Sequence, residues 1–270
     1  SFPTRRSSDL NPDTIVVMIS GSPVEMPWKD RVRGLIWCYY SGMETGTALA
    51  EILLGKVNPS GKLPETFPVR YRDTVTAGNG EFLKPGRIEL KEGIFVGYRY
   101  YEKEKVKPAF PFGFGLSYTE FEMKDLEAEV VGSQEAEGKN VYAAGTDREI
   151  TGSAGSKSEG NPAQCCVRVR VFVTNRGDRA GAEVVQCYVA DPECSVARPV
   201  KELKAFRKVF LNPGETKEVV MELPYRAFAY FDEKCRKFVV EEGEFEICVG
   251  NSSDNCGMGK KIKLGQRMGN

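Results

Sequence analysis

The chain has 270 residues, of which 41% are apolar and 28% charged, and its 38 basic residues balance its 38 acidic ones. These proportions are typical of a globular protein with one to three domains. A balanced charge gives no long-range attraction to nucleic acid or to an anionic membrane, and no apolar run approaches the roughly 20 residues needed to cross a bilayer. We therefore expect neither a nucleic-acid partner nor a membrane partner, and the sequence leaves the oligomeric state open.

Histidine is absent from the sequence. This excludes Ser-His-Asp and Cys-His mechanisms within the chain and removes the commonest ligand of transition metals. Acid-base chemistry would have to come from Asp and Glu. The eight cysteines form no Cys-x-x-Cys pair, so we expect no zinc site. We interpret most of them as free thiols in apolar positions, which favours a reducing, cytoplasmic compartment.

The first ten residues contain no apolar segment of the kind found in a signal peptide. They can be back-translated into a string that resembles a common sequencing-library adapter. We therefore interpret residues 1–10 as an assembly artefact rather than as a disordered natural N-terminus, and expect them to pack against nothing. Under this interpretation the gene continues upstream, and the absence of a targeting signal carries no information on localisation.

Residues 11–117 have the pattern of an α/β unit. The runs 14–20 and 34–40 are continuously apolar, which predicts strands buried on both faces of a parallel sheet. Apolar residues at helical spacing predict a helix over 45–55, with Gly55 as its C-terminal cap. Strand, helix and ordered loops in this sequence indicate the remainder of an α/β sandwich with Rossmann-like layers.

From residue 118 to 264 the pattern changes to that of an all-β domain, followed by a tail at 265–270. Residues 132–164 are rich in small and charged residues and predict an inserted, poorly ordered loop. Elsewhere apolar residues alternate with polar ones between turn sequences, which predicts a β-sandwich. The residues expected to share its core are Val167, Val169, Val171, Val185, Val219, Met221, Phe245 and Ile247.

Several motifs, taken in order, resemble those of glycoside hydrolase family 3. In the α/β unit they are Asn-Pro-Asp-Thr-Ile-Val-Val at 11–17, Ser-Gly-Ser-Pro at 20–23, Asn-Pro-Ser-Gly-Lys-Leu-Pro at 58–64, and the aromatic stretches 93–101 and 110–118. The stretches 198–203 and 213–216 resemble the fibronectin type III-like domain of the same family. The resemblance covers nearly everything from Asn11 to about Gly250.

The resemblance implies a fragment of a retaining, exo-acting β-glycosidase, in particular a β-glucosidase, without metal or organic cofactor. In the family an Asp nucleophile lies on an N-terminal barrel, and a Glu acid/base lies on a loop ahead of the motif that begins at Asn11. Both positions would precede this sequence, so we assign no catalytic residue and expect the isolated chain to be inactive. An oligosaccharide or an aryl or alkyl β-glycoside would then bind through the barrel.

Three features have competing interpretations. The resemblance suggests that Glu44, in a Gly-x-Glu loop, lines the substrate cleft; alternatively, its carboxylate stabilises the N-terminus of the following helix. Arg176-Gly177-Asp178 matches an integrin-adhesion tripeptide, but a tight turn in which Gly177 supplies a positive φ explains it more simply. Seven aromatic residues could stack on sugars, although packing within the domain is the commoner role. They are Phe95, Tyr98, Tyr100, Tyr101, Phe110, Phe112 and Phe114.

Two alternatives to the split-glycosidase interpretation stay open. One is a non-catalytic carbohydrate-binding or adhesion module. The other is a family member with permuted domains, in which the barrel follows this region. The genomic sequence upstream would distinguish them.

Overall fold

The structure is a computed structural model. It describes residues 11, 13–79, 89–131 and 166–265. The expectations for residues 1–10 and 132–164 therefore lie outside the described residues. None of the described helices is long and apolar enough to cross a membrane.

The described chain forms two compact units, which interleave in sequence. The first contains residues up to 57 together with 65–111, and the second contains 58–64 together with residues from 112 onward. The segments 58–64 and 112–117 thus group with the β-sandwich, although the sequence assigns them to the α/β unit. The proposed domain boundary at 117/118 stays a prediction.

The first unit carries a small parallel sheet. Strand β1 (Ile15–Met18) pairs in parallel with β2 (Gly34–Trp37), and helix α2 (Thr45–Leu53) follows. Gly55 has a φ of +70°, the left-handed conformation that favours glycine at a helix end. This order of elements confirms the α/β assignment.

The expected burial of these strands on both faces is wrong for the described chain. Ile15 is 52% exposed, and the rest of β1 and β2 is only half-buried. A two-stranded sheet followed by one helix offers too little surface to cover both faces, so apolar side chains typical of a buried strand lie partly open.

The rest of the first unit consists of short helices and ordered loops around a small aromatic cluster. The short helices are η1 (Lys29–Arg31), η2 (Tyr71–Asp73), α3 (Val75–Asn79) and α4 (Tyr98–Lys103). Phe67 is 1% exposed, and its ring lies 4.7 Å from that of Trp37 and 6.2 Å from that of Phe110. An isolated bridge pairs Phe67 with Phe110, so this cluster ties residue 67 to the far end of the unit's sequence.

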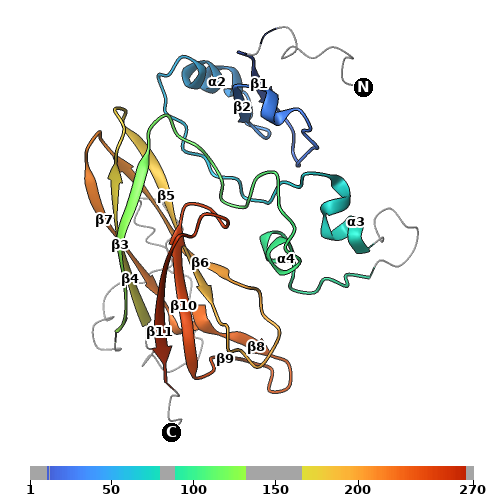
Figure 1. The fold of residues 1–270 in the computed structure, drawn as a ribbon, viewed down its shortest axis with the longest axis vertical. Helices are drawn as coiled ribbons and strands as arrows, with labels where there is room; N and C mark the ends of the chain where they lie inside the picture. Colours follow the sequence, from blue (N-terminus) through green and yellow to red (C-terminus); the bar gives the residue numbers. More distant parts are fainter. Residues whose placement is uncertain (1–10, 12, 80–88, 132–165, 266–270) are drawn as a thin grey trace. The chain divides into compact units, whose positions relative to one another are not determined.

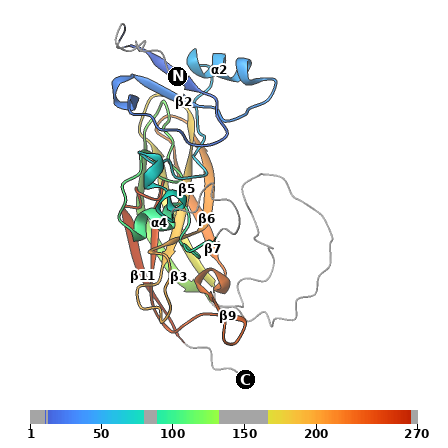
Figure 2. The same cartoon turned by 90° about the vertical axis from the view of Figure 1, so that its right-hand side faces the viewer.

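The second unit is an antiparallel β-sandwich, and its strands run along one another in both views (Figures 1 and 2). One sheet has the order β3-β4-β7 and the other the order β11-β10-β5-β6. The strands are β3 (Phe121–Val131), β4 (Cys166–Asn175), β5 (Gly181–Ala190), β6 (Glu202–Leu211), β7 (Thr216–Leu223), β10 (Gly243–Gly250) and β11 (Met258–Leu264). A short hairpin of β8 (Tyr230–Asp232) and β9 (Lys237–Val239) follows the single turn η3 (Tyr225–Phe228).

The sandwich core confirms the predicted alternation. All eight residues assigned to it lie in one buried cluster, and none is more than 5% exposed. The register places Val169 opposite Met221 and Val171 opposite Val219, so apolar side chains meet across β4 and β7. Because side chains alternate along a strand, the same register turns Arg168 and Arg170 to the outer face.

Charged side chains on that outer face form a ladder between neighbouring strands. Arg170 contacts Glu127 of β3 at 2.6 Å, and Arg168 contacts Glu129 at 3.7 Å and Glu222 of β7 at 3.5 Å. These partly exposed pairs contribute little stability individually, but opposite charges on facing positions favour this register over a shifted one.

The turn at Gly177 needs a glycine for a different reason from the one expected. Gly177 is not among the described residues with positive φ. Instead, a Cβ at this position would lie 2.2 Å from Oγ1 of Thr119, which donates a hydrogen bond to Asn175. The requirement is close approach of two segments. Positive φ does occur in the Pro-Gly turn before β7, where Gly214 has a φ of +72°.

Shortening one core side chain tests the sandwich. Ile247 is fully buried and lies opposite Val189 in the register of β10 and β5. We expect Ile247→Ala to lower the free energy of unfolding by about 2–5 kcal/mol, measured by chemical denaturation. Lys263→Ala, on exposed β11 surface, should change it by less than about 0.5 kcal/mol. Equal effects of the two variants would contradict the assignment of Ile247 to the core.

Candidate functional site

Glu44 lies at the N-cap position of helix α2 and is exposed. Its side chain makes no capping hydrogen bond to the helix. The loop before it is held locally by Thr45, whose hydroxyl donates to the carbonyl of Gly42 at 2.7 Å. Two neighbours, Tyr40 and Met43, are exposed by 79% and 101%. The loop therefore presents a carboxylate and apolar side chains together on the surface of the first unit.

The motif at 58–64 is anchored to the sandwich by a buried ion pair. Nζ of Lys62 lies 2.7 Å from Oε1 of Glu183 on β5, and the two side chains are only 11% and 7% exposed. Lys62 also donates to the carbonyl of Gly115 at 2.8 Å, while Glu183 accepts from Asn251 at 3.3 Å. These additional hydrogen bonds offset part of the cost of burying both charges.

The same motif pairs with the aromatic stretch 110–118. The amide of Leu63 donates to the carbonyl of Phe114, and the amide of Gly113 donates to the carbonyl of Leu63, both at 2.8 Å. A Cβ on Gly115 would lie 2.1 Å from the carbonyl oxygen of Gly61. Glycine is therefore required at position 115, because the two backbones approach too closely there for any side chain.

Asn58 also holds the 58–64 motif in place, through both the nitrogen and the oxygen of its side-chain amide. Its Nδ2 donates to the carbonyl of Ala180 at 3.0 Å, and its Oδ1 accepts from the hydroxyl of Ser117 and the amide of Tyr118. A Cβ on Gly181 would lie 2.5 Å from Nδ2 of Asn58. The motif residues thus serve packing and hydrogen bonding within the second unit.

The seven aromatic residues of the 95–114 stretch are buried to different degrees. Tyr101 is 7% exposed and packs edge-on against Tyr100 at 5.6 Å, whereas the other six are half-buried. Nζ of Lys103 lies 4.0 Å from the ring centre of Phe95, a favourable cation–π contact. Tyr101 fits the packing role, and nothing in the arrangement singles out one ring as a sugar platform.

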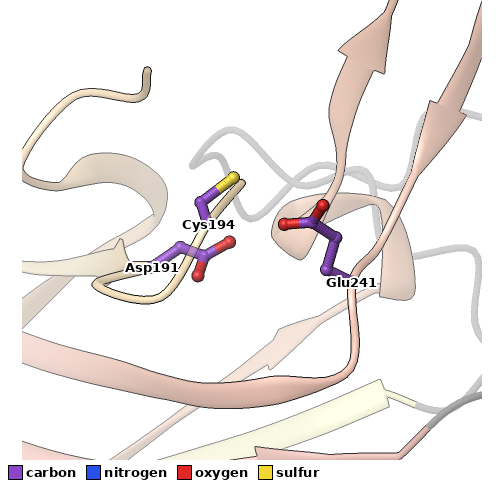
Figure 3. Close-up of side chains that lie close together, drawn as sticks. All are labelled: Asp191, Cys194 and Glu241. Atoms are coloured by element: carbon purple, nitrogen blue, oxygen red, sulfur yellow. The ribbon is translucent and has the colours of Figure 1, made fainter. Parts of the chain in front are cut away.

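A cluster that the sequence did not predict lies at one end of the sandwich (Figure 3). Asp191 and Cys194 come from the loop after β5, and Glu241 comes from the turn before β10. One potential ligand atom from each lies within 4.8 Å of the others, a spacing that would suit a metal ion. Asp191 and Glu241 are 50 positions apart without a shared pattern, so no sequence signal could have found them.

The partners of these carboxylates indicate a structural network rather than a metal centre. The side chain of Arg198 is 6% exposed and donates from Nη1 to Asp191 at 2.9 Å and to the carbonyl of Phe228 at 3.0 Å. Ser195 donates its amide to Glu241 at 2.9 Å and also its hydroxyl, and these bonds hold the pKa of Glu241 below its usual range. A cation here would have to compete with the guanidinium already bound to Asp191.

The Arg-Gly-Asp tripeptide has its arginine engaged. Nε of Arg176 donates to Glu122 of β3 at 2.6 Å. Hydrogen bonds from Lys124 and Arg176 hold the pKa of Glu122 below its usual range. Together with the close approach at Gly177, this pairing accounts for the tripeptide as a turn.

Two family models match the chain. The model "Glycosyl hydrolase family 3 C-terminal domain" matches residues 5–118, and the model "Fibronectin type III-like domain" matches residues 183–253. The two matches follow the order expected from the motifs.

Curated relatives and solved structures agree with the models. The chain is 43% identical over 261 residues to "Thermostable beta-glucosidase B" of Acetivibrio thermocellus and 42% identical over 250 residues to "Probable beta-glucosidase I" of Aspergillus fumigatus. These alignments cover 95% and 92% of this chain but only 30% and 27% of the relatives. The chain therefore spans less than a third of the length of these relatives.

Among solved structures, the chain resembles a β-glucosidase from Kluyveromyces marxianus in complex with glucose, with a TM-score of 0.78 and 39% identity. It also resembles the "GH3 beta-glucosidase" of Bifidobacterium adolescentis, with a TM-score of 0.80 and 35% identity. These matches cover 96% and 95% of this chain and 28% and 34% of the other chains.

The buried ion pair yields a prediction on stability. We expect Lys62→Met to lower the free energy of unfolding by about 3–5 kcal/mol, because it leaves the carboxylate of Glu183 buried without its cation. The double variant Lys62→Met/Glu183→Gln should regain most of the loss, as measured by chemical denaturation. The matched control is Lys261→Met, which breaks the exposed 2.6 Å pair with Glu244 and should cost less than about 1 kcal/mol. A loss in Lys62→Met as small as in this control would contradict the prediction.

Proposed function

This chain belongs to glycoside hydrolase family 3, and we propose that it is the C-terminal part of a retaining, exo-acting β-glucosidase. The proposed substrates are oligosaccharides and aryl or alkyl β-glycosides with a terminal β-linked sugar. The observation that carries this proposal is the 43% identity to a β-glucosidase along 95% of the chain. We further propose that the chain is inactive by itself.

The inactivity follows from what a retaining mechanism requires. Two carboxyl groups must lie about 5–5.5 Å apart, and one must hold a proton at neutral pH because its pKa is raised. Among the described residues, Asp191 and Glu241 form one close pair, with an oxygen of each within 4.8 Å of the other. Asp191 is bound by Arg198, and the hydrogen bonds from Ser195 lower the pKa of Glu241 instead of raising it. This pair has no proton donor for a leaving group.

We propose Glu44 as a residue that contacts substrate when the whole enzyme is assembled. Its carboxylate is exposed and makes no capping bond to α2, so it is accessible to a sugar hydroxyl. An ionised carboxylate makes strong hydrogen bonds to such hydroxyls. The alternative role, stabilising the helix dipole, needs only its charge near the helix N-terminus.

An assay of the isolated chain tests the inactivity. We expect no release of nitrophenol from an aryl β-glucoside above a heat-denatured control. If turnover were found and were lost in Glu241→Gln, the Asp191–Glu241 pair would be catalytic and the proposal wrong.

A chimera tests the parent function and Glu44 together. We would join the N-terminal part of the Acetivibrio thermocellus β-glucosidase, up to the start of the matched region, to residues 11–264 of this chain. We expect the folded chimera to hydrolyse the aryl β-glucoside, because this chain replaces a segment of the same family and fold.

Within the chimera, Glu44→Gln should raise KM by about tenfold or more, as expected for loss of a hydrogen bond to a charged group. The matched control, Glu51→Gln on the exposed surface of α2, should leave KM within about twofold. A folded chimera without turnover would contradict the parent function. Unchanged KM in an active chimera that carries Glu44→Gln would leave only the helix-dipole role for this residue.

A further inference from the structure

Apolar side chains are exposed at the edge of the first unit where β1 and β2 end. Ile19, directly after β1, is 57% exposed, and Tyr40 and Met43, in the loop after β2, are exposed as well. The carboxyl ends of two parallel strands lie at the same edge of a sheet. The two loops touch there, at Gly21, where a Cβ would lie 2.6 Å from the ring of Tyr40. We call Ile19, Tyr40 and Met43 the carboxyl-edge surface.

The turn that presents Tyr40 is anchored through the residue before it. Tyr39 has a φ of +47°, a left-handed conformation that is unfavourable for a residue with a Cβ. Its hydroxyl donates to Oε1 of Glu65 at 3.2 Å, and its ring packs edge-on against Trp37, with 5.9 Å between the ring centres. A strained conformation of this kind persists only where the surrounding contacts fix it, and it is commonest at functional positions. Tyr40 is therefore exposed on an anchored turn and not on a loose loop.

The composition of the carboxyl-edge surface is typical of the centre of a protein–protein interface. Aromatic residues and Met are enriched there, whereas single apolar residues scattered over a surface need no explanation. The strands behind this surface are only half-buried, although apolar strands of a parallel sheet are normally covered on both faces. A sugar site would need several polar groups that converge on the ring hydroxyls, and Met43 offers none.

The lengths of the relatives indicate what covers this surface. The family model that matches residues 5–118 is that of a C-terminal domain, and the Acetivibrio thermocellus relative aligns with 95% of this chain over only 30% of its own length. We propose that the carboxyl-edge surface is the docking site for the N-terminal part of the parent enzyme. The proposal rests on the proposed function and adds which residues meet that part. Because Glu44 directly follows Met43, docking here brings its carboxylate to the boundary between the two parts.

The reactivity of an introduced thiol tests whether the surface is covered. Met43→Cys and, in a second variant, Tyr40→Cys are made in the purified 270-residue chain and in the chimera with the Acetivibrio thermocellus β-glucosidase. Alkylation by iodoacetamide is followed at each position by peptide mass spectrometry. We expect alkylation at both positions to be about tenfold slower or more in the chimera, because a covered thiol is withdrawn from water and from the reagent.

Two controls separate docking from a general change in the chain. Lys56→Cys places a thiol at an exposed position just beyond the other end of α2, and the native Cys235 is exposed in the β8–β9 turn of the second unit. Both should react at rates within about twofold in the two proteins. A chimera with the N-terminal part of the Bifidobacterium adolescentis enzyme gives the same comparison if the first chimera does not fold.

Unchanged alkylation at positions 40 and 43 in a folded chimera would overturn the proposal. Protection only when glucose is added would overturn it in favour of a sugar site, and protection in the isolated chain that grows with protein concentration would do so in favour of a second copy. Activity is a separate readout. A chimera that protects both positions but hydrolyses no β-glucoside contradicts the proposed function alone, whereas an active chimera that leaves them reactive contradicts the docking surface alone.

Discussion

Strand β5 is buried on both of its faces, and much of the second unit follows from this constraint. Its inward side chains, such as Val185 and Cys187, fill the sandwich core. Two of its polar side chains are buried as well, with Gln186 3% exposed and Glu183 5% exposed. A buried polar group is costly unless it is hydrogen-bonded. The segments that pack against Gln186 and Glu183 therefore have to supply matching groups, which restricts their sequences more than apolar packing would.

The covering segments meet this requirement from three parts of the chain. Lys62 neutralises Glu183. Nε2 of Gln186 donates to the carbonyl of Gly113 at 3.1 Å and to that of Asn251 at 2.7 Å, while its Oε1 accepts from Tyr188. This explains why the segments 58–64 and 112–118 belong with the sandwich in the structure. The loop at 251–256, which brings Cys256 over β10, takes part in the same layer.

The sequence predicted those strands whose inward residues are apolar without interruption, and it did not predict β3, β6 and β11. Strand β3 has five acidic or basic side chains among its eleven residues, and a bulge between Lys124 and Glu127 breaks its alternation where Asp125 takes a φ of 55°. A chain segment with this composition does not show the regular alternation of apolar and polar residues that predicts a strand. It is a strand because apolar residues on either side of the bulge, such as Met123 and Leu126, pack against the sandwich core, while Arg168 and Arg170 on β4 offer partners to its glutamates; this information is held in other segments. Glu44 was placed correctly at a helix start, but whether it meets a sugar depends on groups that the described residues do not include.

The motifs that carry the family resemblance consist mainly of residues that allow close packing. Gly113, Gly115 and Gly181 each stand where a Cβ would overlap another atom, and Asn58 and Lys62 bond to backbone or to β5. Such residues identify a fold strongly, because a substitution disrupts a buried layer regardless of what the enzyme hydrolyses. They carry correspondingly little information on the sugar. The exposed loop that ends at Glu44 differs from these motifs, because packing within this chain does not restrict its exposed side chains, and we propose it as one position that influences the choice of sugar.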